Sequence, residues 1–185
     1  MRQVIWTAIL FTLSCGLSTG SSAQETRNWK DIDCAQVKIA AAAGLKCRSL
    51  NYAGVNSSAT SSRGVFQQLN ASGTVKNAKV YYHLHEMMSS GASVTTKSNL
   101  SETIRNISPQ AKTASGFSEL STRNGVDFVT FTGSAGEACI GVRRFGPAAT
   151  AGYKWILYAT RCTPAKATVS DSDIAAFIAG TVPSS

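Results

Sequence analysis

Apolar and polar residues alternate along the C-terminal half of the chain, in stretches separated by turn-forming residues. Residues 117–132 turn at Asn124-Gly125, and this pair favours a type I′ turn because both of its positions tolerate positive φ. The turn predicts that Ser121 pairs with Phe128 on the neighbouring strand. A second alternating stretch, residues 138–162, follows directly. The pattern therefore predicts an antiparallel meander that ends in a hairpin.

The two cysteines at the ends of this last hairpin set its register. If Cys139 faces Cys162, antiparallel pairing places Phe145 opposite Ile156 and Arg143 opposite Tyr158. The reversal then falls in residues 146–152, which are rich in glycine, alanine and proline.

Elsewhere the periodicity indicates three helices and two strands. Alanine-rich residues 31–44 predict an N-terminal helix that is capped by Asp31 or Asp33 and stopped by Gly44. Shorter helices are expected over residues 99–108, before Pro109, and over residues 170–180. Residues 50–55 and 79–88 carry the β-branched and aromatic side chains typical of strands, whereas residues 64–75 have too few apolar positions to assign.

These elements indicate an α+β fold. We expect an antiparallel sheet of four to five strands, including the C-terminal meander, packed against an N-terminal and a C-terminal helix. In the last hairpin both faces carry apolar residues, so the sheet is expected to be covered on both sides or curled towards a barrel. Residues 24–185 have the length of a single domain.

Residues 1–23 have the pattern of a secretory signal peptide, with Arg2, an apolar core from Val4 to Leu13, and small residues before Ala23. The apolar core is shorter than the roughly 20 residues that a transmembrane helix needs. The sequence therefore predicts a secreted or periplasmic protein without a transmembrane segment. Lipoprotein anchoring through Cys15 is the alternative, although Thr12 stands where a lipobox usually has leucine.

Four cysteines remain after the leader is removed, and an even number in an exported chain indicates disulfides. We expect the pairs Cys34–Cys47 and Cys139–Cys162, because each closes a local unit. A zinc site is the alternative, but neither pair has the short spacing of a metal knuckle.

Charge favours an anionic partner. The chain has a formal net charge of +8, which becomes +7 once Arg2 leaves with the leader. Basic residues are not interleaved with aromatic ones densely enough to predict a nucleic-acid groove. The last hairpin supplies a candidate anion-binding set, consisting of Arg143, Arg144, Lys154, Trp155 and Arg161. In the expected register, Arg144 and Arg161 share a face with Trp155, whereas Arg143 lies on the other face with Tyr158.

A second candidate site is the run His83-Leu84-His85-Glu86-Met87. On a strand, His83, His85 and Met87 project to one side, and imidazole with thioether is a ligand set that suits copper. The competing interpretation is that these side chains have a structural or surface role. No other cofactor is indicated.

No catalytic motif is present. The chain lacks a Gly-x-Ser-x-Gly elbow and a phosphate-binding glycine loop, and its closely spaced aspartates lie at expected helix starts. The sequence therefore favours a non-catalytic binding or envelope-associated protein that recognises an anionic partner such as a glycan or a lipid headgroup. A copper-binding protein is the first alternative, and a hydrolase with an unidentified site is the second.

Overall fold

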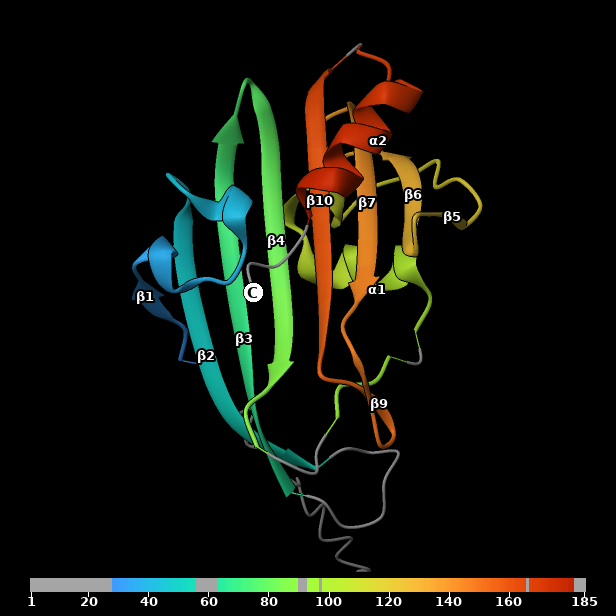
Figure 1. The fold of residues 1–185 in the computed structure, drawn as a ribbon. Coiled ribbons are helices and arrows are strands. Elements are labelled where there is room, and N and C mark those ends of the chain that lie inside the picture. Colours follow the sequence, from blue (N-terminus) through green and yellow to red (C-terminus); the bar gives the residue numbers. More distant parts are fainter. Residues whose placement is uncertain (1–27, 56–62, 90–92, 97, 166, 182–185) are drawn as a thin grey trace, which may run out of the picture.

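The computed structural model describes residues 28–55, 63–89, 93–96, 98–165 and 167–181, and this part of the chain folds around one eight-stranded antiparallel sheet (Figure 1). The strand order is β1-β2-β3-β4-β10-β7-β6-β5. Their bounds are β1 Lys30–Ile32, β2 Lys46–Val55, β3 Arg63–Val75, β4 Ala78–Met87, β5 Ser121–Arg123, β6 Val126–Thr132, β7 Glu137–Phe145 and β10 Trp155–Ala165. The chain segment that connects β7 to β10 forms a separate short ribbon, β8 (Ala148–Ala149) with β9 (Gly152–Tyr153).

The meander has the register expected from the sequence. Asn124 and Gly125 have φ values of 51° and 72°, as a type I′ turn requires, and Ser121 pairs with Phe128. Across β7 and β10, Cys139 pairs with Cys162. The same register joins Phe145 to Ile156 and Arg143 to Tyr158.

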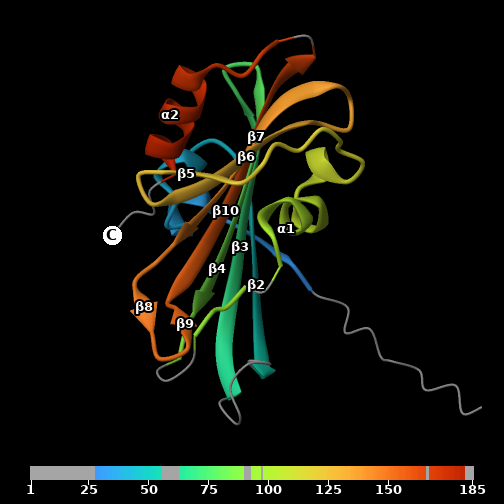
Figure 2. The same cartoon turned by 90° about the vertical axis from the view of Figure 1, so that its right-hand side faces the viewer.

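Two α-helices lie on opposite faces of the sheet, as Figure 2 shows in a view along the sheet. Helix α1 (Leu100–Ile107) begins where the Asn99 side chain accepts a hydrogen bond from the backbone N of Glu102. Helix α2 (Asp171–Gly180) begins with a capping box formed by Ser170 and Asp173. Each helix buries one stripe of apolar residues, so the sheet has an α1 face and an α2 face.

Each face has its own apolar core. Helix α2 contributes Ile174, Phe177 and Ile178 to the first core, which also contains Leu69, Leu84, Val142 and Leu157 from the strands. Helix α1 contributes Leu100 and Ile104 to the second core, together with Val129, Phe131, Ile156 and the Cys139–Cys162 pair. The sheet is therefore covered on both faces. Its strand order is open, with β1 and β5 at the edges, so the barrel alternative is not realised in the described residues.

The N-terminal helix predicted over residues 31–44 is wrong. This segment forms strand β1 followed by two 3-10 turns, Cys34–Gln36 and Ala40–Ala42, with extended backbone at Val37 and Ile39. The extended conformation buries Val37 and Ile39 in the core of the α2 face. Alanine helix propensity is worth only tenths of a kcal/mol per residue, whereas burial of an aliphatic side chain is worth about 1.5–3 kcal/mol, so tertiary packing prevails.

The expectation of four to five strands is too small, although the α+β class holds in its broad form. Strand β3, which the sequence left unassigned, is 13 residues long and joins β2 to β4. Its pairing with both neighbours extends the sheet beyond the C-terminal meander.

Both expected disulfides are present. Cys34 bonds Cys47, which joins the first 3-10 turn to β2, and Cys139 bonds Cys162 across β7 and β10. The predicted leader, residues 1–23, and its Cys15 lie outside the described residues.

Candidate functional site

Helix α2 is tied to the sheet by arginines from three strands. Arg123 of β5 and Arg161 of β10 form ion pairs with Asp171 and Asp173 at the helix start, with N–O distances of 3.4 Å and 3.1 Å. At the other end, Arg144 of β7 donates from Nη2 to the backbone oxygen of Ile178 at 3.2 Å. A cation at a helix C-terminus satisfies a free carbonyl and is favoured by the helix dipole.

These contacts give structural partners to Arg144 and Arg161, two residues of the predicted anion-binding set. Arg144 lies partly buried beneath the end of α2, and its Nε has no hydrogen-bond partner within the described residues. Trp155 packs against the core of the α2 face. Its indole lies so close to Gly146 that a Cβ at that position would collide with the ring. Lys154 is exposed. Arg161 shares this face with Arg144 and Trp155, and its side chain is partly exposed.

Arg143 lies on the opposite face, as the register predicted. Its Nη2 and Nε donate to Asp127 Oδ2 at 2.7 Å and 3.1 Å, and Nη1 donates to the backbone oxygen of Ser98. The guanidinium also lies 4.9 Å from the centre of the Phe145 ring. The structure thus divides the five predicted residues between two faces.

A pocket of about 550 Å³ lies beside α2 and includes Arg161. It is bounded by α2, the second 3-10 turn, the β3–β4 turn, and the side of β4 and β10 that faces α2. Its polar residues are Lys76, Tyr82, Arg161 and Asp173, and its apolar residues are Ala41, Ala43, Val75, Val80, Ala176, Phe177 and Gly180. This volume lies within the usual range for small-molecule sites, about 300–1,000 Å³. Four stretches of the chain form it: residues 41–43, 75–82, 161 and 173–180.

Three of the polar groups differ in their charge and availability. Asp173 accepts hydrogen bonds from the side chain and the backbone N of Ser170 and from Arg161, and these contacts hold its pKa below the ordinary value. Burial raises the pKa of Tyr82, although the nearby Arg161 partly opposes this effect. The phenol therefore remains a neutral hydrogen-bond donor at physiological pH. Lys76, at φ 46° in the β3–β4 turn, forms no ion pair within the described residues.

Arg161 retains binding capacity despite its pairing. Its Nη1 binds Asp173 Oδ1 at 3.1 Å, and its side chain is 26% exposed. Within the described part of the chain, Nε and Nη2 of Arg161 have no hydrogen-bond partner and are not sealed from solvent. A guanidinium with free N–H groups in a fixed fork is the side chain best suited to a carboxylate or a phosphate.

The predicted metal ligands lie on the α1 face. His83, His85 and Met87 alternate along β4 on one side, as a strand requires. His83 Nδ1 lies 2.6 Å from Asn70 Oδ1, and His85 Nε2 lies 2.6 Å from the Tyr52 hydroxyl. Among the described residues, no group of three or more His, Cys, Asp and Glu is arranged to hold a metal ion. Copper binding stays a prediction.

His83 also belongs to a row of polar side chains that crosses the whole sheet on the α1 face. Backbone pairing places one polar residue from every strand side by side, in the order Asp31, Arg48, Asn70, His83, Tyr158, Arg143, Asp127 and Thr122. Neighbours are joined by ion pairs at both ends, by the His83–Asn70 bond, and by a bond between Arg143 and Tyr158. This polar row is largely satisfied by its own members.

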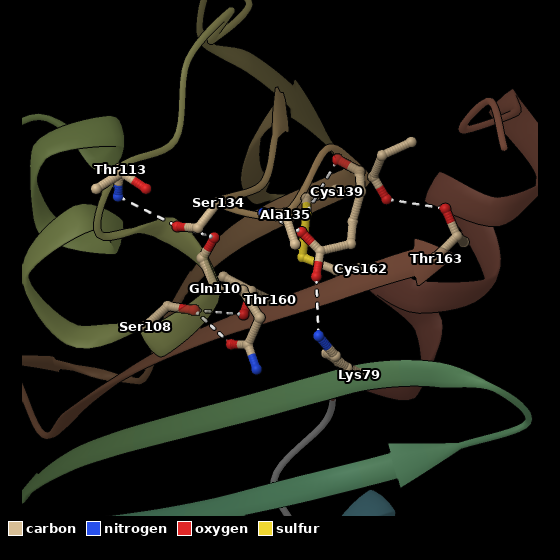
Figure 3. Close-up of a disulfide and its surroundings, with 12 residues drawn as sticks. Lys79, Ser108, Gln110, Thr113, Ser134, Ala135, Cys139, Thr160, Cys162 and Thr163 are labelled. Carbon is tan, nitrogen blue, oxygen red and sulfur yellow. Dashed lines mark hydrogen bonds and ion pairs between the residues drawn. A yellow bond between two sulfur atoms is a disulfide. The ribbon is translucent and has the colours of Figure 1, made fainter. Parts of the chain in front are cut away.

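Polar groups also surround the Cys139–Cys162 disulfide (Figure 3). Ser108 and Thr160 are 1% exposed and share a hydrogen bond of 2.9 Å, and Ser108 also donates to Gln110. Glu137 accepts from Lys79 Nζ at 3.0 Å and from the backbone N of Ala135 at 2.9 Å. Burial by itself raises the pKa of Glu137, but these bonds outweigh it and hold the pKa below its ordinary value. All of these groups have internal partners, so they support the hairpin.

Sequence reasoning did not identify Tyr82 or Lys76, and it interpreted Asp173 only as a helix cap. The alternation along β4 contains a signal for Tyr82, because it places Tyr82 and Val80 on the face opposite His83. No local pattern links them to Arg161 or to α2.

Comparison of the chain with protein-family models, with curated proteins and with solved structures finds no match. In the described residues, neither helix has the length and apolar character required to cross a bilayer.

Proposed function

We propose that the protein is an exported, non-catalytic binding protein that holds an anionic ligand in the pocket beside α2. The observation that supports this proposal is the combination of Arg161 and Lys76 with an apolar cavity of about 550 Å³. Arg161 has N–H groups available for an anion, and Tyr82 adds a neutral hydroxyl donor nearby. The net charge of +7 after loss of the leader favours approach of such a ligand.

The proposal is tested on residues 24–185 with three anionic probes: sodium hexadecanoate, vesicles of phosphatidylcholine with phosphatidylglycerol, and polygalacturonate. At least one probe is expected to bind at low ionic strength and to bind more weakly as salt is added, because salt screens the attraction. The double variant Lys76→Gln/Arg161→Gln is expected to lose this binding.

The matched control removes two charges elsewhere. Lys30 and Lys112 are exposed and lie outside the pocket, so Lys30→Gln/Lys112→Gln has the same net charge as the pocket variant. If the two double variants bind equally well, attraction is a property of overall charge and the proposed pocket is wrong. Failure of the wild-type protein to bind any of the three probes overturns the function itself.

Copper binding remains the alternative prediction, supported by the common side of β4 on which His83, His85 and Met87 project. Titration calorimetry with Cu²⁺ and Cu⁺ separates it from the pocket proposal. The copper prediction requires heat in the wild-type protein that disappears in His83→Ala/His85→Ala. A hydrolase stays the second alternative, for which a substrate screen is the test.

A further inference from the structure

The walls of the α2 pocket are formed by small and apolar side chains. Ala41 and Ala43 face the pocket from the N-terminal segment, and Ala176 and Gly180 face it from α2. Val80 and the Phe177 ring add apolar surface between them. Walls of this kind offer few hydrogen bonds along their length, which suits a slender hydrocarbon better than a sugar chain.

The two cationic groups of the pocket come from different elements than these alanines. Arg161 belongs to β10, where it is paired with Val80 of β4, and Lys76 belongs to the turn that joins β3 to β4. Both cations therefore lie towards the β3–β4 turn. The pocket thus combines an apolar groove with a cationic group, which is the complement of an amphiphile with one anionic group.

Resting on the proposed function, we infer that the ligand is a long-chain fatty acid whose carboxylate binds Arg161 and whose hydrocarbon chain lies between α2 and the second 3-10 turn. A carboxylate matches the planar fork of a guanidinium. A volume of about 550 Å³ suits a single chain, whereas a two-chain phospholipid is larger. Lys76 adds a second positive charge at the pocket.

Asp173 sets the strength of this interaction because it competes for the same guanidinium. Its Oδ1 lies 3.1 Å from Arg161 Nη1, while its Oδ2 accepts from the backbone N of Ser170 in the capping box. The negative charge beside Arg161 opposes a second carboxylate. Asp173→Asn removes the charge and keeps an oxygen for the helix cap, so it is expected to strengthen fatty-acid binding several-fold.

The first experiment measures the affinity of residues 24–185 for saturated fatty acids from decanoate to hexadecanoate, each below its micelle concentration. Burial of one methylene is worth about 0.8 kcal/mol, so affinity is expected to rise by up to about fourfold for each carbon that enters the groove. Arg161→Gln is expected to weaken binding of every acid by tenfold or more. Hexadecanol, which has no charge, is expected to bind equally well to the wild type and to Asp173→Asn.

A pair of neighbouring alanines provides the steric control. Ala176 lines the pocket and Ala175 does not, while both are exposed on α2. Ala176→Phe is expected to fill the groove and abolish binding, and Ala175→Phe is expected to bind as the wild type does. Thermal unfolding of both variants verifies that the fold is kept.

The outcomes separate this inference from the proposed function. Affinity that does not depend on chain length, or binding that survives Ala176→Phe, overturns the fatty-acid assignment. Arg161-dependent binding of phosphatidylglycerol vesicles or polygalacturonate, with no binding of fatty acids, also overturns it and leaves the proposed function standing. An unchanged affinity in Asp173→Asn shows that Asp173 does not compete.

Discussion

Arg143 and Asp127 face each other across β6 and β7, and Arg143 Nη2 lies 2.7 Å from Asp127 Oδ2. Their side chains are only 11% and 17% exposed, so the pair is screened from water on the α1 face. Desolvated pairs of this kind are sensitive to loss of one partner, because the remaining charge is left buried.

Asp127→Ala is expected to lower the free energy of unfolding by about 3 kcal/mol, since Arg143 then keeps only uncharged partners: the Ser98 carbonyl, the Tyr158 hydroxyl and the Phe145 ring. Urea denaturation measures the change. The control is Asp31→Ala, which breaks the exposed Arg48–Asp31 pair and is expected to cost less than about 0.5 kcal/mol. Equal losses in the two variants contradict the burial argument.

Gly141 of β7 lies directly beneath α1, where an added Cβ collides with the Ile104 side chain. Gly141→Ala is therefore expected to destabilise the fold by about 1–3 kcal/mol through overpacking. Adding Ile104→Val, which removes the colliding methyl group, is expected to restore part of the lost stability. Gly180→Ala is the matched control, because a Cβ added at Gly180 meets nothing within 4 Å, and it is expected to leave stability unchanged or slightly raised.

Glu137 is expected to make the free energy of unfolding of the protein fall in acid. Its pKa is lowered in the folded state, so the unfolded chain binds the proton more readily, and stability falls as the pH drops below about 4.5, the ordinary value. Glu137→Gln is expected to reduce this fall and to cost about 1–2 kcal/mol at neutral pH, through weaker bonds to Lys79 and Ala135. The control is Glu119→Gln at an exposed site. If Glu137→Gln loses stability in acid as steeply as this control does, Glu137 does not have this role.

Tyr81 predicts the opposite behaviour in alkali. Burial raises its pKa from 10.0 to about 12, so the unfolded chain releases the phenolic proton first, and stability falls as the pH rises from 10 to 12. Tyr81→Phe is expected to be less sensitive in this window, by up to about 2 kcal/mol at its upper end. Denaturant titrations at several pH values, with Tyr153→Phe for comparison, measure the difference. No change in the alkaline slope would falsify the assignment.

The parts of the fold that sequence reasoning predicted well depend on local signals. Asn124-Gly125 determines its turn through backbone conformation, and the position of Cys139 and Cys162 at hairpin ends determines both register and disulfide. The helices expected over residues 99–108 and 170–180 likewise begin at residues, Asn99 and Ser170, whose capping bonds act within a few residues. Each of these signals is strong because no distant residue is needed to satisfy it.

The missed parts depend on distant partners. Strand β3 places Gln68, Asn70 and Ser72 towards the α1 face, where they pair with His85, His83 and Tyr81 of β4. Because these positions are polar on both strands, β3 lacks the apolar alternation that normally reveals a strand. In the N-terminal segment a local signal misleads: its alanines have high helix propensity, but Val37 and Ile39 are buried against the sheet in an extended conformation.

The candidate site was predicted only in part for the same physical reason. Register alone placed Arg161 on the face with Trp155, but the pocket also requires the β3–β4 turn, the 3-10 segment and α2. No periodicity within the chain shows that these segments meet. The separation of Arg143 from Arg144 is, in contrast, a direct result of strand alternation.

The two outermost strands of the sheet have only three residues each. An incoming strand therefore finds room for very few backbone hydrogen bonds at β1 or β5, although the central strands have up to 13 residues. Lys30, Asp31, Ser121 and Thr122 are also exposed along these margins, and charged or polar edges disfavour pairing between copies. The short, polar margins at β1 and β5 therefore disfavour edge-to-edge pairing between copies at these two strands.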